Sequence, residues 1–309
     1  MSKRKGENRT LQGACFLLLG MLILTGCTKK AEPFVKDTNH SKTKNKQGAK
    51  KMETEKIVEQ IKQKNPTVTA YKLKVAPEVA QSIAHLMQNE DPEVRKMALE
   101  VLNNTPGQPT RQAVIRGLRD ENINVSSLAG RMLQIHHDKA ELPILLQELS
   151  ANQDEMMREY IALALGKIGD STAIEPLQTQ IVKELDPDAR HAMHLALTRL
   201  KEPENQKQYT QRLKQDNPKE KAAAVQDFEY IKDPVFLKEI LLLLDDTRPA
   251  INVGKSNRKK YIRVCDVVIN SIDAALEHPF AFDIFPRKEY SSDEIKQAKE
   301  TLWSIIGNV

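Results

Sequence analysis

The stretch NQDEMMREYIALALGKIGDSTAIEPL, residues 152–177, holds two short helical stripes of apolar residues separated by a Gly-Asp turn. Met157, Ile161 and Leu165 recur at intervals of four, which places them on one face of a helix. A single hairpin of this size buries little apolar surface, so the fold depends on whether the unit recurs along the chain.

The same pattern recurs on both sides of this stretch. Each copy begins with Asp, carries Arg four residues later and continues as an apolar ladder, in DPEVRKMALEVLNN (91–104), DEMMREYIALALGK (154–167) and DPDARHAMHLALTR (186–199). The recurring polar residues are Asp91, Arg95, Asp154, Arg158, Asp186 and Arg190. Two weaker copies carry Ser126 and Lys221 in the Arg position, and the five positions are spaced by 31, 32, 32 and 31 residues.

A second helix is expected after the Gly-Asp turn. Its apolar face is predicted to contain Ile174, Leu177, Ile181 and Leu185. Ser171 stands where an N-cap is needed. A period of 31–32 residues built from two helices predicts an all-α solenoid of about five or six stacked hairpins.

The unit resembles the HEAT repeat, particularly its short bacterial form with D-x-x-V-R-x-x-A at the start and a Gly-Asp turn. The resemblance covers roughly residues 77–246 and implies a right-handed solenoid that binds another macromolecule along its inner, concave helix surface. The recurring Asp and Arg are expected to be structural, because an Asp can cap a helix start while it pairs with a nearby Arg. The tetratricopeptide repeat is the nearest rival, but its Trp, Gly and Tyr pattern is absent.

Positive charge is concentrated at the N-terminal end of the chain. The formal charge of the whole chain is +5, yet residues 1–51 carry +9 and residues 52–309 carry −4. A nucleic-acid partner is therefore not expected for the body. Residues 27–51 lack apolar periodicity and are predicted to form a disordered basic tether.

The first 26 residues have the composition of a signal peptide. A cationic start is followed by FLLLGMLIL (16–24), which is shorter than the ~18 apolar residues that a membrane-spanning helix needs. An uncleaved membrane anchor with an incidental cysteine is the alternative interpretation.

The four residues Leu24, Thr25, Gly26 and Cys27 resemble the lipobox of bacterial lipoproteins. The resemblance implies that the chain is cleaved before Cys27, that this cysteine carries the covalent lipid, and that the exported protein is held at a membrane. No Asp follows the cysteine, which favours the outer membrane in a cell that has two. No other cofactor is expected.

The repeat pattern is predicted to end at residue 246. A basic loop is expected over residues 247–260, then an apolar helix over 261–276 and further C-terminal helices up to residue 309. This segment is expected to cap the solenoid; alternatively, its aromatic residues, which include Phe280, Phe282, Phe285 and Trp303, bind a partner. A cluster of basic residues is a candidate contact for an anionic partner and comprises Lys255, Arg258, Lys259, Lys260 and Arg263.

No catalytic or metal-binding constellation is found in the sequence. His191 and His194 lie three residues apart on a predicted helix, but no carboxylate or cysteine cluster completes a metal site. In the alignment of the repeats, His194 takes an apolar position and His191 a polar one. HEAT-like bilin lyases provide an enzymatic precedent, but no motif supports that interpretation here. The chain is therefore expected not to be an enzyme.

The leading hypothesis is a lipid-anchored envelope protein whose residues 52–246 serve as a scaffold for an unidentified protein partner. One alternative is a ligand-binding or enzymatic protein that uses a pocket in residues 247–309. The other is a structural envelope protein that associates with itself.

Overall fold

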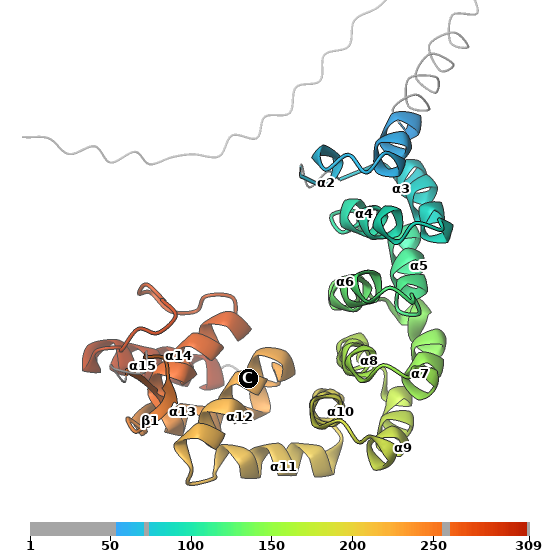
Figure 1. Ribbon diagram of the computed structural model, residues 1–309. Helices are drawn as coiled ribbons and strands as arrows, with labels where there is room; N and C mark the ends of the chain where they lie inside the picture. The colour runs from blue at the N-terminus through green and yellow to red at the C-terminus, as the bar shows by residue number, and fades with distance from the viewer. Residues whose placement is uncertain (1–53, 71–73, 255–259, 308–309) are drawn as a thin grey trace, which may run out of the picture. The chain divides into compact units, whose positions relative to one another are not determined.

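Helical hairpins follow one another along the computed structural model, which describes residues 54–70, 74–254 and 260–307 (Figure 1). The first helices of the five predicted repeats are α4 (Pro92–Leu102), α6 (Ile123–Leu133), α8 (Glu155–Ile168), α10 (Pro187–Arg199) and α12 (Pro218–Ile231). The second helices are α5 (Gln108–Gly117), α7 (Leu142–Ala151), α9 (Ile174–Lys183), α11 (Pro203–Leu213) and α13 (Leu237–Leu242). A helix at residues 54–62, α2 (Thr67–Ala70) and α3 (Pro77–Ala84) precede them.

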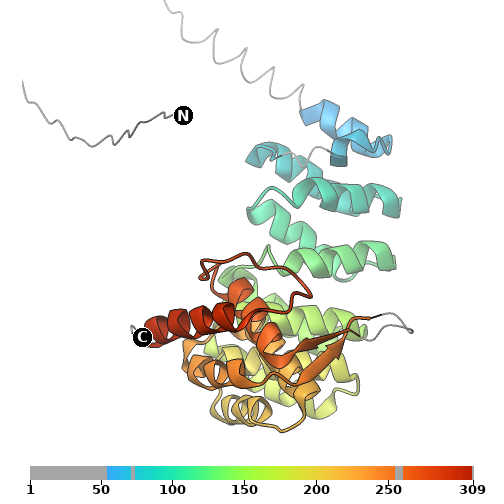
Figure 2. The same cartoon turned by 90° about the vertical axis from the view of Figure 1, so that its left-hand side faces the viewer.

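The hairpins stack as two layers of helices (Figures 1 and 2). One layer contains α4, α6, α8 and α10, and the other contains α3, α5, α7 and α9. All described residues belong to one of the two units into which the chain divides, Lys50–Val309. The predicted all-α solenoid of stacked hairpins is confirmed.

Side chains before each first helix fix where that helix begins. The capping side chain accepts a hydrogen bond from a backbone N–H two or three residues on, in Asp91, Asn122, Asp154, Asp186 and Asn217. Asp186 accepts two such bonds, from Asp188 N at 3.1 Å and from Ala189 N at 2.8 Å. These caps replace the intrahelical partners that the first N–H groups of a helix lack.

The apolar ladders form the interior of the stack. Met157, Ile161 and Leu165 have no exposed surface, and the equivalent ladder of α4 is also buried. One core cluster runs from Ile61 to Leu197, and a second runs from Leu195 to Leu302. Each hairpin therefore buries its apolar face against its neighbours, which is how a solenoid is stabilised.

Two details of the predicted second helix are wrong. Asp170, not Ser171, is the cap: its side chain accepts a hydrogen bond from Thr172 N at 3.0 Å at the start of a 3₁₀ turn. Leu185 is 89% exposed, because α9 ends at Lys183 and Glu184 adopts an extended conformation. The helix thus ends two residues before the apolar pattern does.

The segment after residue 246 contains a β-hairpin that the sequence analysis did not predict. β1 (Pro249–Asn252) pairs antiparallel with β2 (Tyr261–Arg263), and α14 (Val264–Ala275) follows directly. The helix predicted from residue 261 begins at Val264, since the Asp266 side chain accepts from the backbone N–H of Arg263 at 3.1 Å. α14 packs on α12, and α15 (Ser292–Gly307) packs on α13.

A search of the described residues for a membrane-crossing helix finds none of sufficient length and apolarity. The predicted signal segment and Cys27 lie outside the described residues.

Candidate functional site

The recurring arginines connect consecutive repeats. Arg95 of α4 donates through Nε and Nη2 to the two carboxylate oxygens of Asp120, at 2.6 and 2.7 Å. Its Nη1 donates to the carbonyl oxygens of Asn89 and Glu90 at 2.8 and 2.9 Å. One guanidinium therefore holds the loop before its own helix and the loop before the next repeat.

Arg158 of α8, two repeats further along, makes a similar set of contacts. It donates to Glu184 at 2.6 and 2.8 Å and to the carbonyl oxygen of Asn152 at 3.0 Å. Hydrogen bonds from Arg158 lower the pKa of Glu184, while Glu184 raises the pKa of Arg158. Arg190 then donates to the backbone oxygen of Glu184, so this residue accepts from two successive arginines.

The capping carboxylates of Asp91, Asp154 and Asp186 accept from backbone N–H groups, as predicted for a cap. The predicted pairing of these carboxylates with a nearby Arg is not what the arginines show: Arg95 and Arg158 bind acidic residues 25 and 26 positions later. These acidic residues were missed. A detectable signal existed, because Asp120 and Glu184 each stand six residues before the Arg position of the following repeat.

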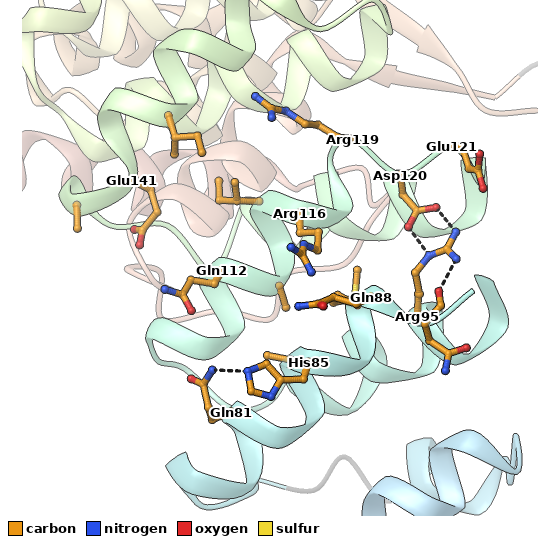
Figure 3. A pocket seen from close by; sticks show the side chains of 17 residues that line it. Gln81, His85, Gln88, Arg95, Gln112, Arg116, Arg119, Asp120, Glu121 and Glu141 are labelled. Atoms are coloured by element: carbon orange, nitrogen blue, oxygen red, sulfur yellow. Dashed lines mark hydrogen bonds and ion pairs between the residues drawn. The ribbon is translucent and has the colours of Figure 1, made fainter. Parts of the chain in front are cut away.

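A pocket of about 860 Å³ opens beside the first of these arginines, between α3, α5 and α7 (Figure 3). Its lining includes the apolar residues Ala84, Met87, Ala113, Ile115, Ala140 and Ile144. Amide and charged side chains complete it and include Gln81, Gln88, Gln112, Arg116, Arg119 and Glu141. We call this pocket the α5 groove.

Polar groups in the α5 groove are only partly satisfied by one another. Oε1 of Glu141 accepts from Arg111 at 2.9 Å, whereas its buried Oε2 has no hydrogen-bond partner among the described residues. The side chains of Gln112 and Arg116 are exposed. Nε2 of Gln81 lies 3.3 Å from Nε2 of His85. The groove thus combines apolar surface with the exposed polar side chains of Gln112 and Arg116, which a bound chain can reach.

The predicted basic cluster is only partly within the described residues. Lys255, Arg258 and Lys259 lie outside them, and Lys260 is exposed. Arg263 makes its hydrogen bonds within the protein. Its guanidinium donates to the carboxylate of Asp266 at 2.7 and 2.8 Å and to the backbone oxygen of Tyr290 at 2.7 Å. The guanidinium of Arg263 therefore stabilises the start of α14, and its contact with an anionic partner stays a prediction.

The histidines singled out in the sequence make separate contacts. Nε2 of His191 lies 3.0 Å from a carboxylate oxygen of Asp227, and Nδ1 of His194 lies 2.7 Å from the amide oxygen of Asn205. Within residues 54–70, 74–254 and 260–307, no group of three or more His, Cys, Asp or Glu side chains is placed to hold a metal ion. Cys265 is buried, and burial raises the pKa of its thiol to about 11.

The C-terminal aromatic residues divide between the core and the surface. Phe280 stacks on Phe282 with ring centroids 5.4 Å apart, and Phe282 contacts Tyr290 at 5.8 Å. Phe285 and Trp303 are 56% and 57% exposed. α15 buries Ala298 and Leu302 completely, so the segment covers part of the second core cluster and also presents aromatic surface.

Comparison with known proteins supports the repeat assignment. Residues 112–198 and 142–226 match the family model for HEAT repeats. This segment is a run of HEAT-like repeats. A search of the curated proteins found no match. Among solved structures, the chain is similar to one from the complex of CpcE and CpcF of phycocyanin lyase from Nostoc sp. PCC7120, at 17% identity and a TM-score of 0.47. The match covers 77% of this chain and 86% of that one.

Proposed function

We propose that this protein is a lipid-anchored scaffold that binds an extended segment of a partner protein in the α5 groove. The observation that carries the proposal is the groove itself, which places apolar surface beside the exposed side chains of Gln112 and Arg116. HEAT-like repeats stack into an open solenoid, and the extended surface of a solenoid binds other macromolecules.

The chemistry of the groove favours a polypeptide segment. Apolar side chains of the segment bury surface against Met87, Ile115 and Ile144. Backbone N–H and C=O groups of the segment pair with the exposed amide of Gln112. This combination of apolar contacts and a small number of oriented polar groups is typical of specific binding sites.

Membrane attachment is the second part of the proposal. Cys27 carries the lipid, and residues 28–51 form the tether between the membrane and the repeats. Several acyl chains on one cysteine are needed for stable anchoring, since one chain binds only marginally.

Site-specific photo-crosslinking in the native envelope tests this proposal. A photoreactive residue replaces Gln112, which lies in the groove, and a matched control replaces the exposed Gln208 on α11. We expect one discrete protein adduct from the Gln112 position and none from the Gln208 position. Mass spectrometry of the adduct identifies the partner.

A groove-blocking variant completes the design. Ile144→Arg places a charge in the apolar lining at a residue that is already 36% exposed, so that the helix is retained. We expect this variant to lose the Gln112 adduct while its circular dichroism spectrum is unchanged. An adduct of equal yield in the blocked variant, or the same pattern from Gln208, would refute the groove as the binding site.

A further inference from the structure

The second repeat lacks the arginine that its neighbours use. Ser126 of α6 stands in the position of Arg95, Arg158 and Arg190. Its hydroxyl donates only to carbonyl oxygens of its own helix start, Asn122 at 3.5 Å and Ile123 at 3.4 Å. The series of guanidinium contacts along the stack is therefore interrupted at one known place.

The backbone oxygen that such a guanidinium would contact is still present, whereas the place of the acidic partner is taken by Asn152. In the other three copies the arginine donates to the carbonyl oxygen six residues earlier, which is Asn89, Asn152 or Glu184. The equivalent oxygen in the second repeat belongs to Asp120, and it accepts no hydrogen bond from the part of the chain that the structure describes. Its usual donor is missing because serine is too short to reach it.

A pocket of about 350 Å³ occupies this place. Its lining includes Ser126, Asn152, Gln153, Asp154, Met157 and Glu148. Arg119 and Asp120 line both this pocket and the α5 groove, so the two are adjacent. We call it the Ser126 pocket.

The charge of the Ser126 pocket favours a cation. Asp120 is already paired with Arg95, and Glu148 forms an ion pair with Arg119. The Glu148 side chain is only 2% exposed, whereas that of Arg119 is 55% exposed, so the carboxylate is the enclosed partner. Asp154 adds a further negative charge to the pocket. Its carboxylate accepts one hydrogen bond, from the backbone N–H of Met157.

We propose that the Ser126 pocket binds the guanidinium group of an arginine side chain from the partner protein. The planar fork of donors matches the carbonyl of Asp120, as the protein's own arginines match the equivalent oxygen in three other repeats. The carboxylate of Glu148, which lines the same pocket, supplies the negative charge. The inference rests on the proposed function, because the arginine belongs to a segment bound in the adjacent α5 groove.

Titration of the full chain in detergent micelles with N-acetyl-arginine methylamide tests the inference. Amide chemical shifts are followed by TROSY NMR on ¹⁵N-labelled protein. We expect saturable shifts confined to residues 118–126 and 148–157, with a Kd on the order of 1–10 mM for a single side chain. The lysine analogue is expected to bind at least about fivefold more weakly, because its ammonium lacks the planar fork.

Two substitutions fill the Ser126 pocket from inside. Ser126→Arg restores the side chain found in the other repeats, and Ser126→Leu fills the space without charge. We expect both variants to bind the arginine analogue at least tenfold more weakly. The matched control, Ser150→Arg, adds the same charge at an exposed position of α7 and is expected to leave the Kd within twofold.

The outcomes separate this inference from the proposed function. Absence of saturable shifts in the wild type, equal affinity for the lysine analogue, or unchanged affinity in both filled variants would overturn the arginine site. If the Gln112 adduct persists under any of these results, the groove stands and only the arginine site is wrong.

Discussion

At the scale of single residues, the molecule is organised by buried ion pairs between repeats. The Arg158 side chain is 15% exposed and that of Glu184 is 1% exposed, and two parallel hydrogen bonds join them. Each group is enclosed where water screens it little, so the loss of one partner leaves the other charge uncompensated. These contacts also explain why residues at element boundaries, rather than in helix interiors, define the repeat.

Replacing Arg158 is predicted to destabilise the protein strongly. Arg158→Ala leaves the carboxylate of Glu184 buried without its cationic partner, and we expect the free energy of unfolding to fall by about 3 kcal/mol. Denaturant unfolding followed by circular dichroism measures the change. The matched control is Arg131→Ala on α6, an exposed arginine, which is expected to change stability by no more than about 0.5 kcal/mol. Equal losses from the two variants would contradict this account.

Acid is predicted to weaken the same contact. Because Arg158 lowers the pKa of Glu184 in the folded state, the stabilisation is fully present above the unfolded pKa of about 4.3. It is lost as the pH falls through the lower folded pKa. The difference in unfolding free energy between wild type and Glu184→Gln should therefore shrink as the pH is lowered from 6 towards 3. A difference that grows in acid would reverse the sign and disprove the assignment.

At the scale of elements, close approach of helices depends on small residues at two crossings. A Cβ added to Gly166 of α8 would lie 2.8 Å from the Cα of Ala196 in α10 and would also clash with the hydroxyl of Tyr230. That hydroxyl donates to the backbone oxygen of Leu163 at 2.7 Å, which joins α12 to α8. At Gly130 the obstacle is a side chain, the ring of Tyr160.

Gly166→Ala is predicted to destabilise the stack although alanine favours helix. Alanine gains about 1 kcal/mol over glycine in a helix, but overpacking against a backbone atom costs about 2–3 kcal/mol, so we expect a net loss of about 1–2 kcal/mol. Thermal unfolding followed by circular dichroism measures this loss of stability. Gly307→Ala on α15 is the control, because nothing lies within 4 Å of the added Cβ, and it should cause no loss. A stabilised Gly166→Ala variant would show that α8 and α10 can separate freely.

At the scale of the whole molecule, the proposed architecture combines an anchor, a tether and a folded body. Residues 1–51 carry the excess positive charge and residues 52–309 have an acidic balance, which is compatible with the proposed architecture. A cationic tether is attracted to an anionic membrane surface at about 1 kcal/mol per lysine close to that surface. The body has no such excess.

Lipidation at Cys27 is predicted to be essential for membrane attachment. Cys27→Ser removes the sulfur that the acyl group would modify, and we expect incorporation of radiolabelled palmitate to fall to background, with retention in the membrane fraction lost. Cys15→Ser removes the other N-terminal cysteine and should leave labelling unchanged. Continued labelling of the Cys27→Ser protein would exclude the lipoprotein proposal.

Much of the fold was predictable because its signals are local. The 31–32-residue period and the apolar ladders depend on residues within one hairpin, and a repeated hairpin must bury its face against a neighbour. The ends of the helices were harder to predict from the sequence. The apolar pattern of α9 continues to Leu185, but the helix ends at Lys183, since Glu184 turns to bind Arg158 in the preceding repeat.

The sequence by itself determined the stacked helical hairpins, the capping aspartates of three first helices and the interruption of the arginine series at Ser126. Only the tertiary structure decided which carboxylates the arginines bind, where the α5 groove and the Ser126 pocket open, and that Arg263 is held by Asp266. The physical reason is distance along the chain. Periodicity expresses contacts within a few residues, whereas partners 25 positions apart meet only when the repeats have stacked.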